Sequence, residues 1–169
     1  MCNMKKIIII GCPGSGKSTF GKKLSEITKF PLYHLDMIWH KPDRTTISRE
    51  KFDRRLQEIF NTENWIIEGN YQRTIETRLK ECDTAFLLNI PLEDCISGAK
   101  SRVGKKRDDM PWVETEFNED FRKLIEEFST QKLPAIYELL GKYKDDKKII
   151  IFKSREEIND YIKKLETTI

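Results

Sequence analysis

The sequence predicts one α/β domain built around a parallel β-sheet. Apolar and β-branched residues gather in five short runs, at 5–10, 31–36, 64–69, 84–90 and 148–152. Segments with helical spacing separate these runs, as expected for parallel strands joined by crossover helices that cover both faces of a sheet. The 169-residue chain shows no internal repeat and no long linker, so we expect one domain over residues 1–169.

The helices are predicted from apolar residues that recur every three or four positions. This spacing occurs at 20–27, 48–60, 71–81, 92–103, 117–128 and 133–143. A last helix is predicted from Ser154-Arg155-Glu156-Glu157, a capping box that satisfies backbone amides at a helix start. Pro91 ends the fourth strand, because proline has no amide hydrogen to donate to a sheet.

The composition is that of a compact protein with little excess charge. Thirty-one basic and 28 acidic residues give a net charge of +3, too balanced to indicate a nucleic-acid coat. Apolar residues make up 38% of the chain and fall in periodic blocks, which argues against disorder. No apolar stretch approaches the length that crosses a membrane, so no membrane partner is expected.

The cysteines predict free thiols in a reducing compartment. They are widely spaced, and the two histidines stand apart from them: Cys2, Cys12, Cys82, Cys95, His34 and His40. This spacing fits neither a zinc site nor a disulfide framework. We therefore expect a cytoplasmic protein.

A glycine-rich loop between the first strand and the first helix carries the clearest functional signal. Gly11-Cys12-Pro13-Gly14-Ser15-Gly16-Lys17-Ser18 has the spacing of a Walker A phosphate-binding loop, in the strand-loop-helix context that the motif requires. Backbone amides and the helix start can cradle anionic oxygens, while Lys17 meets the terminal phosphates and the Ser18 hydroxyl can ligate Mg²⁺. The expected nucleotide-binding residues are Gly11, Cys12, Pro13, Gly14, Ser15, Gly16, Lys17, Ser18 and Thr19.

Two carboxylates end the next two predicted strands. Asp36 closes the second strand, and Glu68 closes the third just before Gly69. Ligands of parallel sheets gather beyond the carboxyl ends of strands, where a carboxylate can orient an acceptor hydroxyl, accept its proton or hold Mg²⁺ through water. Each could instead serve an ordinary turn. Trp39 could stack on an aromatic acceptor or pack against the 48–60 helix.

A basic segment, at about 98–117, is predicted to form a lid. It carries Lys100, Arg102, Lys105, Lys106 and Arg107, with Gly104 within it and Asp108-Asp109 at its end. Phosphoryl transfer needs cations on the transferring oxygens, often brought by a segment that closes and excludes water. Arg102 and Arg107 are the favoured pair, because a guanidinium can bond two phosphate oxygens. The alternative is a solvated charge run.

The layout predicts a kinase of small metabolites. A GTPase should carry an Asn-Lys-x-Asp type motif, which this sequence lacks, and its nearest match to the acidic strand of motor ATPases is Trp65-Ile66-Ile67-Glu68. We expect Lys17, Arg102 and Arg107 to neutralise the phosphoryl group in transfer. Asp36 or Glu68 would position an unidentified acceptor of nucleoside or nucleotide type.

Gly11 to Thr19 resembles the phosphate loop of the adenylate-kinase-like superfamily. Within it, 35–39, 65–71 and 107–111 (LDMIW, WIIEGNY and RDDMP) resemble the bacterial topology modulation protein family, and the similarity continues through 149–154. The resemblance implies a three-layer P-loop NTPase fold with strand order 2-3-1-4-5, a mobile lid, and binding of ATP with Mg²⁺. It also implies that Asp36 matches an acidic acceptor or metal contact of shikimate and gluconate kinases, and Glu68-Gly69 the Asp-Gly of adenylate kinases.

The sequence departs from adenylate kinases at two places. After Glu68-Gly69 the Phe-Pro-Arg of those enzymes is missing, and the candidate substrate residue Arg73 is displaced by one position. The Thr-Gly-Asp-x-x-Arg segment that holds AMP is also missing after Phe30-Pro31, which argues against AMP as acceptor.

Two other functions remain as alternatives to a kinase. The family name suggests a DNA-associated regulatory protein that binds nucleotide without turnover, and a nucleotide-dependent sensor would share the same loop. Direct DNA binding is not expected from the nearly balanced charge. The partner expected is a small-molecule phosphoryl acceptor, and no sequence feature indicates an oligomeric state.

Overall fold

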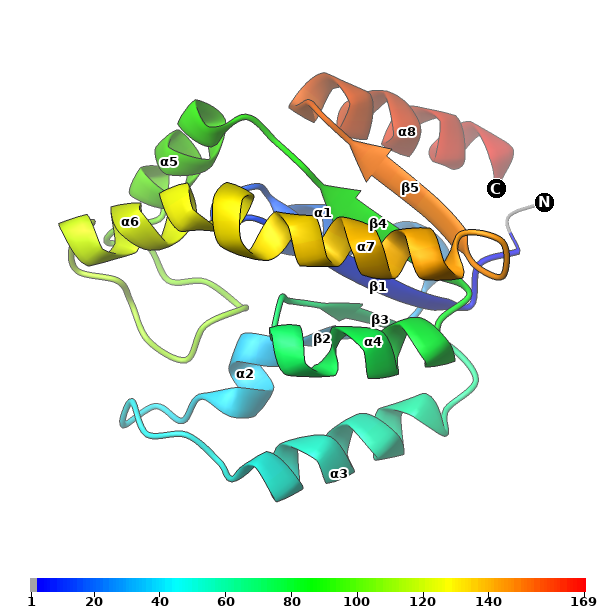
Figure 1. Cartoon of the computed structure of the whole chain (residues 1–169), viewed down its shortest axis with the longest axis horizontal. Helices are drawn as coiled ribbons and strands as arrows, with labels where there is room; N and C mark the ends of the chain where they lie inside the picture. Colours follow the sequence, from blue (N-terminus) through cyan, green and yellow to red (C-terminus); the bar gives the residue numbers. More distant parts are fainter. Residues whose placement is uncertain (1–2) are drawn as a thin grey trace.

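A computed structural model describes residues 3–169 and contains a five-stranded parallel sheet (Figure 1). The strands are β1 (Lys6–Gly11), β2 (Leu32–His34), β3 (Trp65–Glu68), β4 (Thr84–Leu88) and β5 (Lys148–Phe152). Their order across the sheet is β2-β3-β1-β4-β5, which confirms the predicted fold class and strand order. Cys2, one of the expected free thiols, lies outside the described residues.

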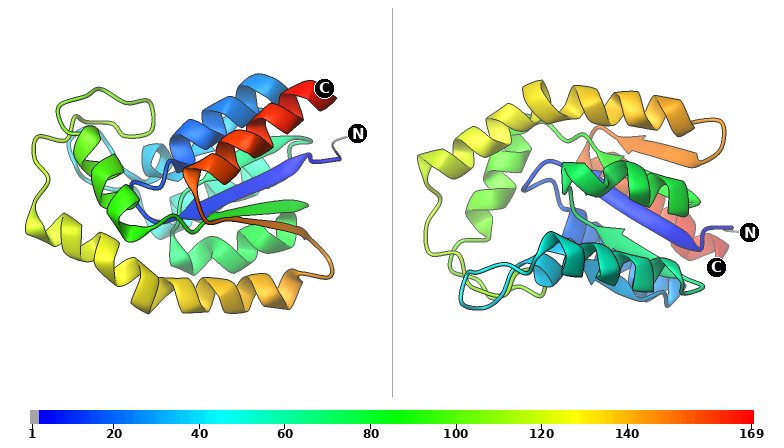
Figure 2. Two further views of the ribbon diagram at one scale, coloured as in Figure 1. Left: turned by 90° about the horizontal axis from the view of Figure 1, so that it is seen from above. Right: turned by 60° about the horizontal axis from the view of Figure 1, so that its bottom comes forward.

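Helices cover both faces of the sheet because its central strands are apolar on both sides. Every residue of β3 and β4 is buried, and Ile8 in β1 pairs with Ile67 on one side and Ala85 on the other. Helices α1 (Lys17–Thr28) and α8 (Arg155–Thr168) pack on one face, whereas α4 (Gln72–Glu81) and α7 (Leu133–Tyr143) lie on the other (Figure 2).

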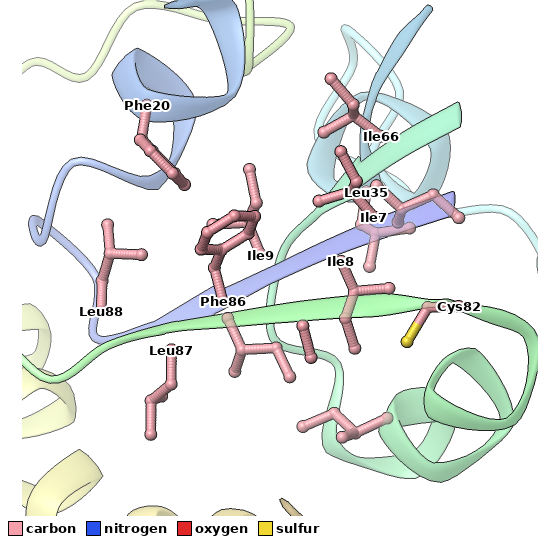
Figure 3. Packing of buried hydrophobic residues seen from close by; sticks show 14 of the residues in the cluster. Ile7, Ile8, Ile9, Phe20, Leu35, Ile66, Cys82, Phe86, Leu87 and Leu88 are labelled. Atoms are coloured by element: carbon pink, nitrogen blue, oxygen red, sulfur yellow. The ribbon is translucent and has the colours of Figure 1, made fainter. Parts of the chain in front are cut away.

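An aromatic cluster fixes α1 and α8 against the sheet. The Phe20 ring lies 4.9 Å from the Phe86 ring and 5.5 Å from the Phe152 ring, centroid to centroid. Tyr161 of α8 joins at 5.4 Å from Phe86. Figure 3 shows Phe20 reaching from α1 toward Phe86 above the isoleucines of β1. These contacts hold the start of α1, and with it the phosphate loop, in a fixed place on the sheet.

The second strand is shorter than predicted, and the expectation that Asp36 closes it is wrong. β2 ends at His34, and Asp36 lies in the first turn of α2 (Leu35–Trp39). The reason is geometric: β2 is an edge strand that pairs only with β3, and the last pair, His34 with Glu68, falls where β3 itself ends. α3 (Arg49–Phe60) then leads back to β3.

The carboxyl ends of the strands are overhung by α5 (Leu92–Ser101) and α6 (Glu119–Glu127), at the left of Figure 1. Between them, residues 102–118 contain no helix or strand and are called the lid here. A π-helical turn, η1 (Phe128–Lys132), joins α6 to α7 in one rod that returns across the sheet. No helix of residues 3–169 is long and apolar enough to span a membrane.

Candidate active site

A cavity of about 820 Å³ lies where the strands end, beneath the lid. Its volume is in the range of small-molecule sites. The phosphate loop, the residues at the ends of β2 and β3, and the lid line it, together with residues of α1, α5, α6 and the start of α8. The predicted site residues among its lining are Pro13, Gly14, Gly16, Lys17, Ser18, Thr19, Asp36, Glu68, Gly69, Arg102 and Arg107. Gly11, Cys12 and Ser15 belong to the loop but do not line the cavity.

The phosphate loop needs glycine at two positions. Gly14 and Gly16 have φ angles of 83° and 97°, which other residues rarely adopt. A Cβ at Gly14 would also lie only 2.0 Å from the Cys95 carbonyl oxygen of α5. The loop is therefore wrapped tightly between the sheet and α5.

The start of α1 offers unused donors to an anion. Its N-cap residue, Gly16, has no side chain to bond the first amides, and the first turn contains no acidic residue. Lys17 Nζ donates to the carbonyl oxygens of Gly11 at 2.9 Å and Cys12 at 3.2 Å, so its charge is not neutralised by a carboxylate. This arrangement suits phosphate oxygens.

Ser18 is the meeting point of two buried carboxylates. Its Oγ lies 2.9 Å from Glu68 Oε1 and 2.8 Å from Asp109 Oδ2 of the lid. One hydroxyl proton can be donated to only one of these oxygens. Since Glu68 and Asp109 are only 4% and 6% exposed, the three groups form a compact set of oxygen ligands of the kind that Mg²⁺ prefers.

The side of the cavity formed by β2, α2 and the end of β3 is called the strand-end wall, and consists of His34, Asp36, Glu68, Gly69, Asn70 and Tyr71. His34 Nδ1 lies 2.7 Å from Glu68 Oε1, and the Tyr71 hydroxyl donates to Asp36 Oδ1 at 2.6 Å. Asn70 Oδ1 accepts from the Gly11 amide at 3.1 Å and so links the wall to the phosphate loop.

Asp36 faces the cavity in an environment that disfavours its charge. Its side chain lines the cavity and is 40% exposed. The surrounding protein raises the pKa of Asp36, with a smaller upward contribution from the Glu68 carboxylate, while the Tyr71 hydrogen bond acts downward. Burial and the nearby Asp36 charge in turn raise the pKa of Tyr71, which remains a neutral donor.

Arg78 of α4 shapes the wall from behind. It is fully buried, and its guanidinium donates to the carbonyl oxygens of Gly69, Asn70 and Tyr71. Gly69 and Tyr71 both have positive φ angles, 138° and 41°, so this turn is held in a conformation that it would not adopt freely. Burial lowers the pKa of Arg78.

The lid is closed over the cavity by contacts at both of its sides. Lys22 Nζ of α1 pairs with Asp108 Oδ2 at 2.6 Å. The Trp112 ring packs against His40, at 5.0 Å between centroids, and beneath the Arg44 guanidinium at 4.9 Å. These contacts join the lid to α1 and to the segment after α2.

Three arginines line the cavity on the side of the phosphate loop and the lid, which is called the donor side here. Arg107 Nε lies 3.4 Å from Asp109 Oδ1, while Arg107 Nη1 and Arg102 Nε are buried without a hydrogen-bond partner. Burial lowers the pKa of Arg102, and the charge of Arg107 adds to this effect. Arg155 Nη2, from the start of α8, donates to the carbonyl oxygens of Gly14 and Asp94.

The relatives of this chain are kinases of small molecules. A shikimate kinase from Clostridium botulinum (strain Loch Maree / Type A3) is 30% identical over 151 residues, covering 80% of this chain and 84% of that protein. This chain belongs to the adenylate-kinase-like P-loop kinases. An adenylate kinase from Thermotoga maritima matches more locally, at 26% identity over 88 residues, 51% of this chain and 39% of that protein. No family model matches the chain.

Solved structures of kinases share the fold. Shikimate kinase from Acinetobacter baumannii in complex with shikimate has a TM-score of 0.63 at 16% identity, covering 98% of this chain and 93% of that one. Deoxyadenosine kinase from M. mycoides has a TM-score of 0.54 at 15% identity, over 96% and 97%. At these sequence identities, the two solved structures show that the fold is shared and no more.

Two predicted substrate residues of this P-loop kinase lie away from its cavity lining. Trp39 packs against Phe52 of α3, 5.5 Å between ring centroids, and against Tyr71 at 6.2 Å. This is the packing alternative that the sequence left open. Arg73 forms an exposed ion pair with Asp53, 2.8 Å between its Nη2 and Oδ1.

Sequence reasoning missed several residues of the kinase site. They are His34, Asn70, Tyr71, Arg78, Asp109 and Arg155. Asp109 was seen only as the end of a basic run, and Arg155 only as part of a capping box. A signal was present for His34 and Tyr71, because both flank the predicted strand-end carboxylates. None was present for Arg78, whose role depends on the path of the turn before α4.

Proposed function

We propose that this P-loop kinase transfers the terminal phosphoryl group of ATP, bound with Mg²⁺, to a hydroxyl group of a small acceptor. The observation that carries the proposal is a single cavity with an anion cradle at Gly14–Ser18 on one side and the Asp36 carboxylate on the other, under a lid that brings two arginines. The kinase relatives support it. As part of this proposal, the chain is a member of the topology modulation protein family, which its motifs resemble.

Donor phosphates would lie on the amides at the start of α1. Lys17 would exchange its two carbonyl partners for phosphate oxygens, which are stronger acceptors. The unpartnered donors of Arg102 and Arg107 would meet the oxygens of the transferring group, where charge must be stabilised. Arg155 would hold the loop backbone at Gly14 in place.

Mg²⁺ fits the oxygen set around Ser18. The Ser18 hydroxyl, with Glu68 and Asp109 beside it, would hold the ion directly or through water. The metal when bound neutralises phosphate charge and orients the donor. Since Asp109 comes from the lid, the same residues join lid closure to the donor site.

Asp36 would orient the acceptor hydroxyl and take its proton. A new bond forms between the acceptor oxygen and the terminal phosphorus, the bond from that phosphorus to the bridging oxygen of ATP breaks, and ADP leaves. The raised pKa of Asp36 makes it a better base than an ordinary aspartate. Tyr71 holds Asp36 Oδ1 and so fixes the orientation of the carboxylate, which leaves Oδ2 for the acceptor hydroxyl.

A DNA-associated protein without turnover is not favoured, because the relatives are kinases. A nucleotide-dependent sensor would have the same cradle but would not need a base opposite it. The position of Asp36 in the same cavity therefore favours phosphoryl transfer over sensing.

The phosphate-loop assignment is tested by Lys17→Ala. We expect ATP affinity measured by calorimetry to fall at least about tenfold, since a charged hydrogen bond contributes about 1.5 to 3 kcal/mol. Lys23→Ala is the matched control, because Lys23 is an exposed lysine of the same helix outside this cavity. Unchanged ATP binding in Lys17→Ala would reject the assignment.

A further inference from the structure

We infer that the acceptor is an uncharged, hydroxyl-rich molecule of the nucleoside or sugar class, and that the site discriminates against acceptors bearing a carboxylate or phosphate. This inference rests on the proposed kinase function. It comes from the chemistry of the strand-end wall, which is rich in hydrogen-bond acceptors and supplies no unengaged cation.

The wall presents two acidic groups side by side. Asp36 and Glu68 both line the cavity. A further negative charge in this region would lie close to both carboxylates and be repelled by them. The effect is visible at Asp36, whose pKa is raised by the surrounding protein and further by Glu68. A carboxylate or phosphate entering this region would add a third negative group.

The two arginines of α4 do not offer a cation to the acceptor region. Arg78 lies behind the strand-end wall with its donors committed to the carbonyl oxygens of residues 69–71. Arg73 pairs with Asp53 and does not line the cavity. Neither residue offers a free guanidinium to an acceptor.

The cations that do line the cavity, among residues 3–169, come from other parts of the chain. They are Lys17, Lys22, Arg102, Lys106, Arg107 and Arg155, from the phosphate loop, α1, the lid and the start of α8. Four of them contact the phosphate loop, the lid or both: Lys17 bonds loop carbonyl oxygens, Lys22 pairs with Asp108, Arg107 pairs with Asp109, and Arg155 bonds the Gly14 carbonyl oxygen. Arg102 belongs to the lid, and its Nε has no hydrogen-bond partner. Positive charge is thus gathered where the ATP phosphates would lie.

Hydroxyl groups, unlike anionic groups, are suited to the strand-end wall because they can donate hydrogen bonds to its oxygens. Each acceptor hydroxyl brings a proton that the Asp36 carboxylate can accept, and the Tyr71 oxygen keeps lone pairs free while its own proton is given to Asp36. An uncharged polyol would satisfy these oxygens without adding charge. The A. baumannii shikimate kinase binds shikimate, a carboxylic acid, so the shared fold would here carry a different acceptor chemistry.

Matched pairs of acceptors test the inference by ADP release from ATP with Mg²⁺. Each pair differs by one anionic group and keeps every hydroxyl: uridine and orotidine, its 6-carboxylate; the methyl ester of a hexuronic acid and the free hexuronate; and the methyl ester of shikimate and shikimate itself. We expect the uncharged member of an active pair to have a kcat/KM at least about tenfold higher. The reason is that two nearby carboxylates repel the added negative charge of the other member, which lowers its kcat/KM about tenfold or more.

The outcomes separate the inference from the proposed function. Faster turnover of the anionic members would overturn the inference and leave the kinase intact. No stimulation by any member, with ATP binding shown by calorimetry, would overturn the kinase activity and the inference with it.

A charge variant probes the cause through binding alone. In protein loaded with a non-hydrolysable ATP analogue and Mg²⁺, Asp36→Asn is expected to narrow the preference for the uncharged member several-fold. Glu76→Gln is the matched control, because it removes the same charge outside the cavity, at a residue paired with Lys142. A preference unchanged by Asp36→Asn would show that the wall's charge does not select the acceptor.

Discussion

The hydrogen bond between Tyr71 and Asp36 and the burial around it act in opposite directions on the pKa of the proposed base. The bond lowers the pKa of Asp36, while the surrounding protein raises it more strongly. Because the folded state holds this proton more tightly than the unfolded chain, stability from Asp36 is present at low pH. It is lost as pH rises from the ordinary value of 3.8 through the higher pKa of the folded state.

Tyr71→Phe should therefore raise the pKa of Asp36 further. The substitution removes the one hydrogen bond that favours the carboxylate and leaves the burial in place. Carbon NMR titration of the Asp36 carboxyl would measure the midpoint in both proteins. A midpoint that stays the same or falls in Tyr71→Phe would contradict the electrostatic account of this pair.

Arg78 has a structural role at the same site. Arg78→Met should lower the free energy of unfolding by about 3 kcal/mol, because one buried and two partly buried carbonyl groups lose their donor. Arg73→Met is the control on the same helix, and should change it by less than about 1 kcal/mol because its ion pair is exposed. Urea unfolding measures both, and equal effects would refute the buried role of Arg78.

The elements of the site differ in how far sequence could predict them. The position and backbone shape of the phosphate loop were predictable, since its glycines, lysine and serine have a fixed spacing that backbone geometry requires. The lid was predictable only as a basic segment. Its folding over Ser18 depends on Asp109, and its closure depends on Trp112 meeting His40 and Arg44, which are contacts between distant segments.

The lid arginine Arg107 should act in turnover more than in binding. Arg107→Ala is expected to reduce kcat about 10²-fold or more while ATP affinity changes little, because its role is to stabilise charge during transfer. Lys105→Ala, in an exposed residue of the same lid outside the cavity lining, should leave kcat near its original value. Steady-state kinetics with calorimetry separates the two quantities, and an equal kcat for both variants would remove Arg107 from the transfer step.

At the scale of the molecule, the sheet was the most predictable part. Alternation of buried strands and helices requires a parallel sheet, and the resemblance supplied the strand order. What escaped prediction lies at its margins: the short edge strand β2, which moved Asp36 into α2, and the π-helical turn η1 within the long rod α6 to α7. Local sequence patterns do not encode where an edge strand loses its partner.

Binding of ATP should stabilise the whole fold. Ligand at a hundred times its Kd raises the free energy of unfolding by about 2.7 kcal/mol if only the folded state binds it, which for a chain of this size is a Tm increase of roughly 5 to 10 °C. Differential scanning calorimetry with Mg²⁺ and ATP would measure the shift. Lys17→Ala at the same ATP concentration should show much less, and a full shift in that variant would place binding elsewhere.

The bond from Arg155 to the Gly14 carbonyl joins residues 141 positions apart. During synthesis the ribosome makes the phosphate loop before α8, so the guanidinium that braces the outer turn of the loop is made later. A nascent chain that stops before α8 would contain the whole motif without this brace. Folding of α8 is thus a condition for a fully braced phosphate loop, although the loop itself is made earlier.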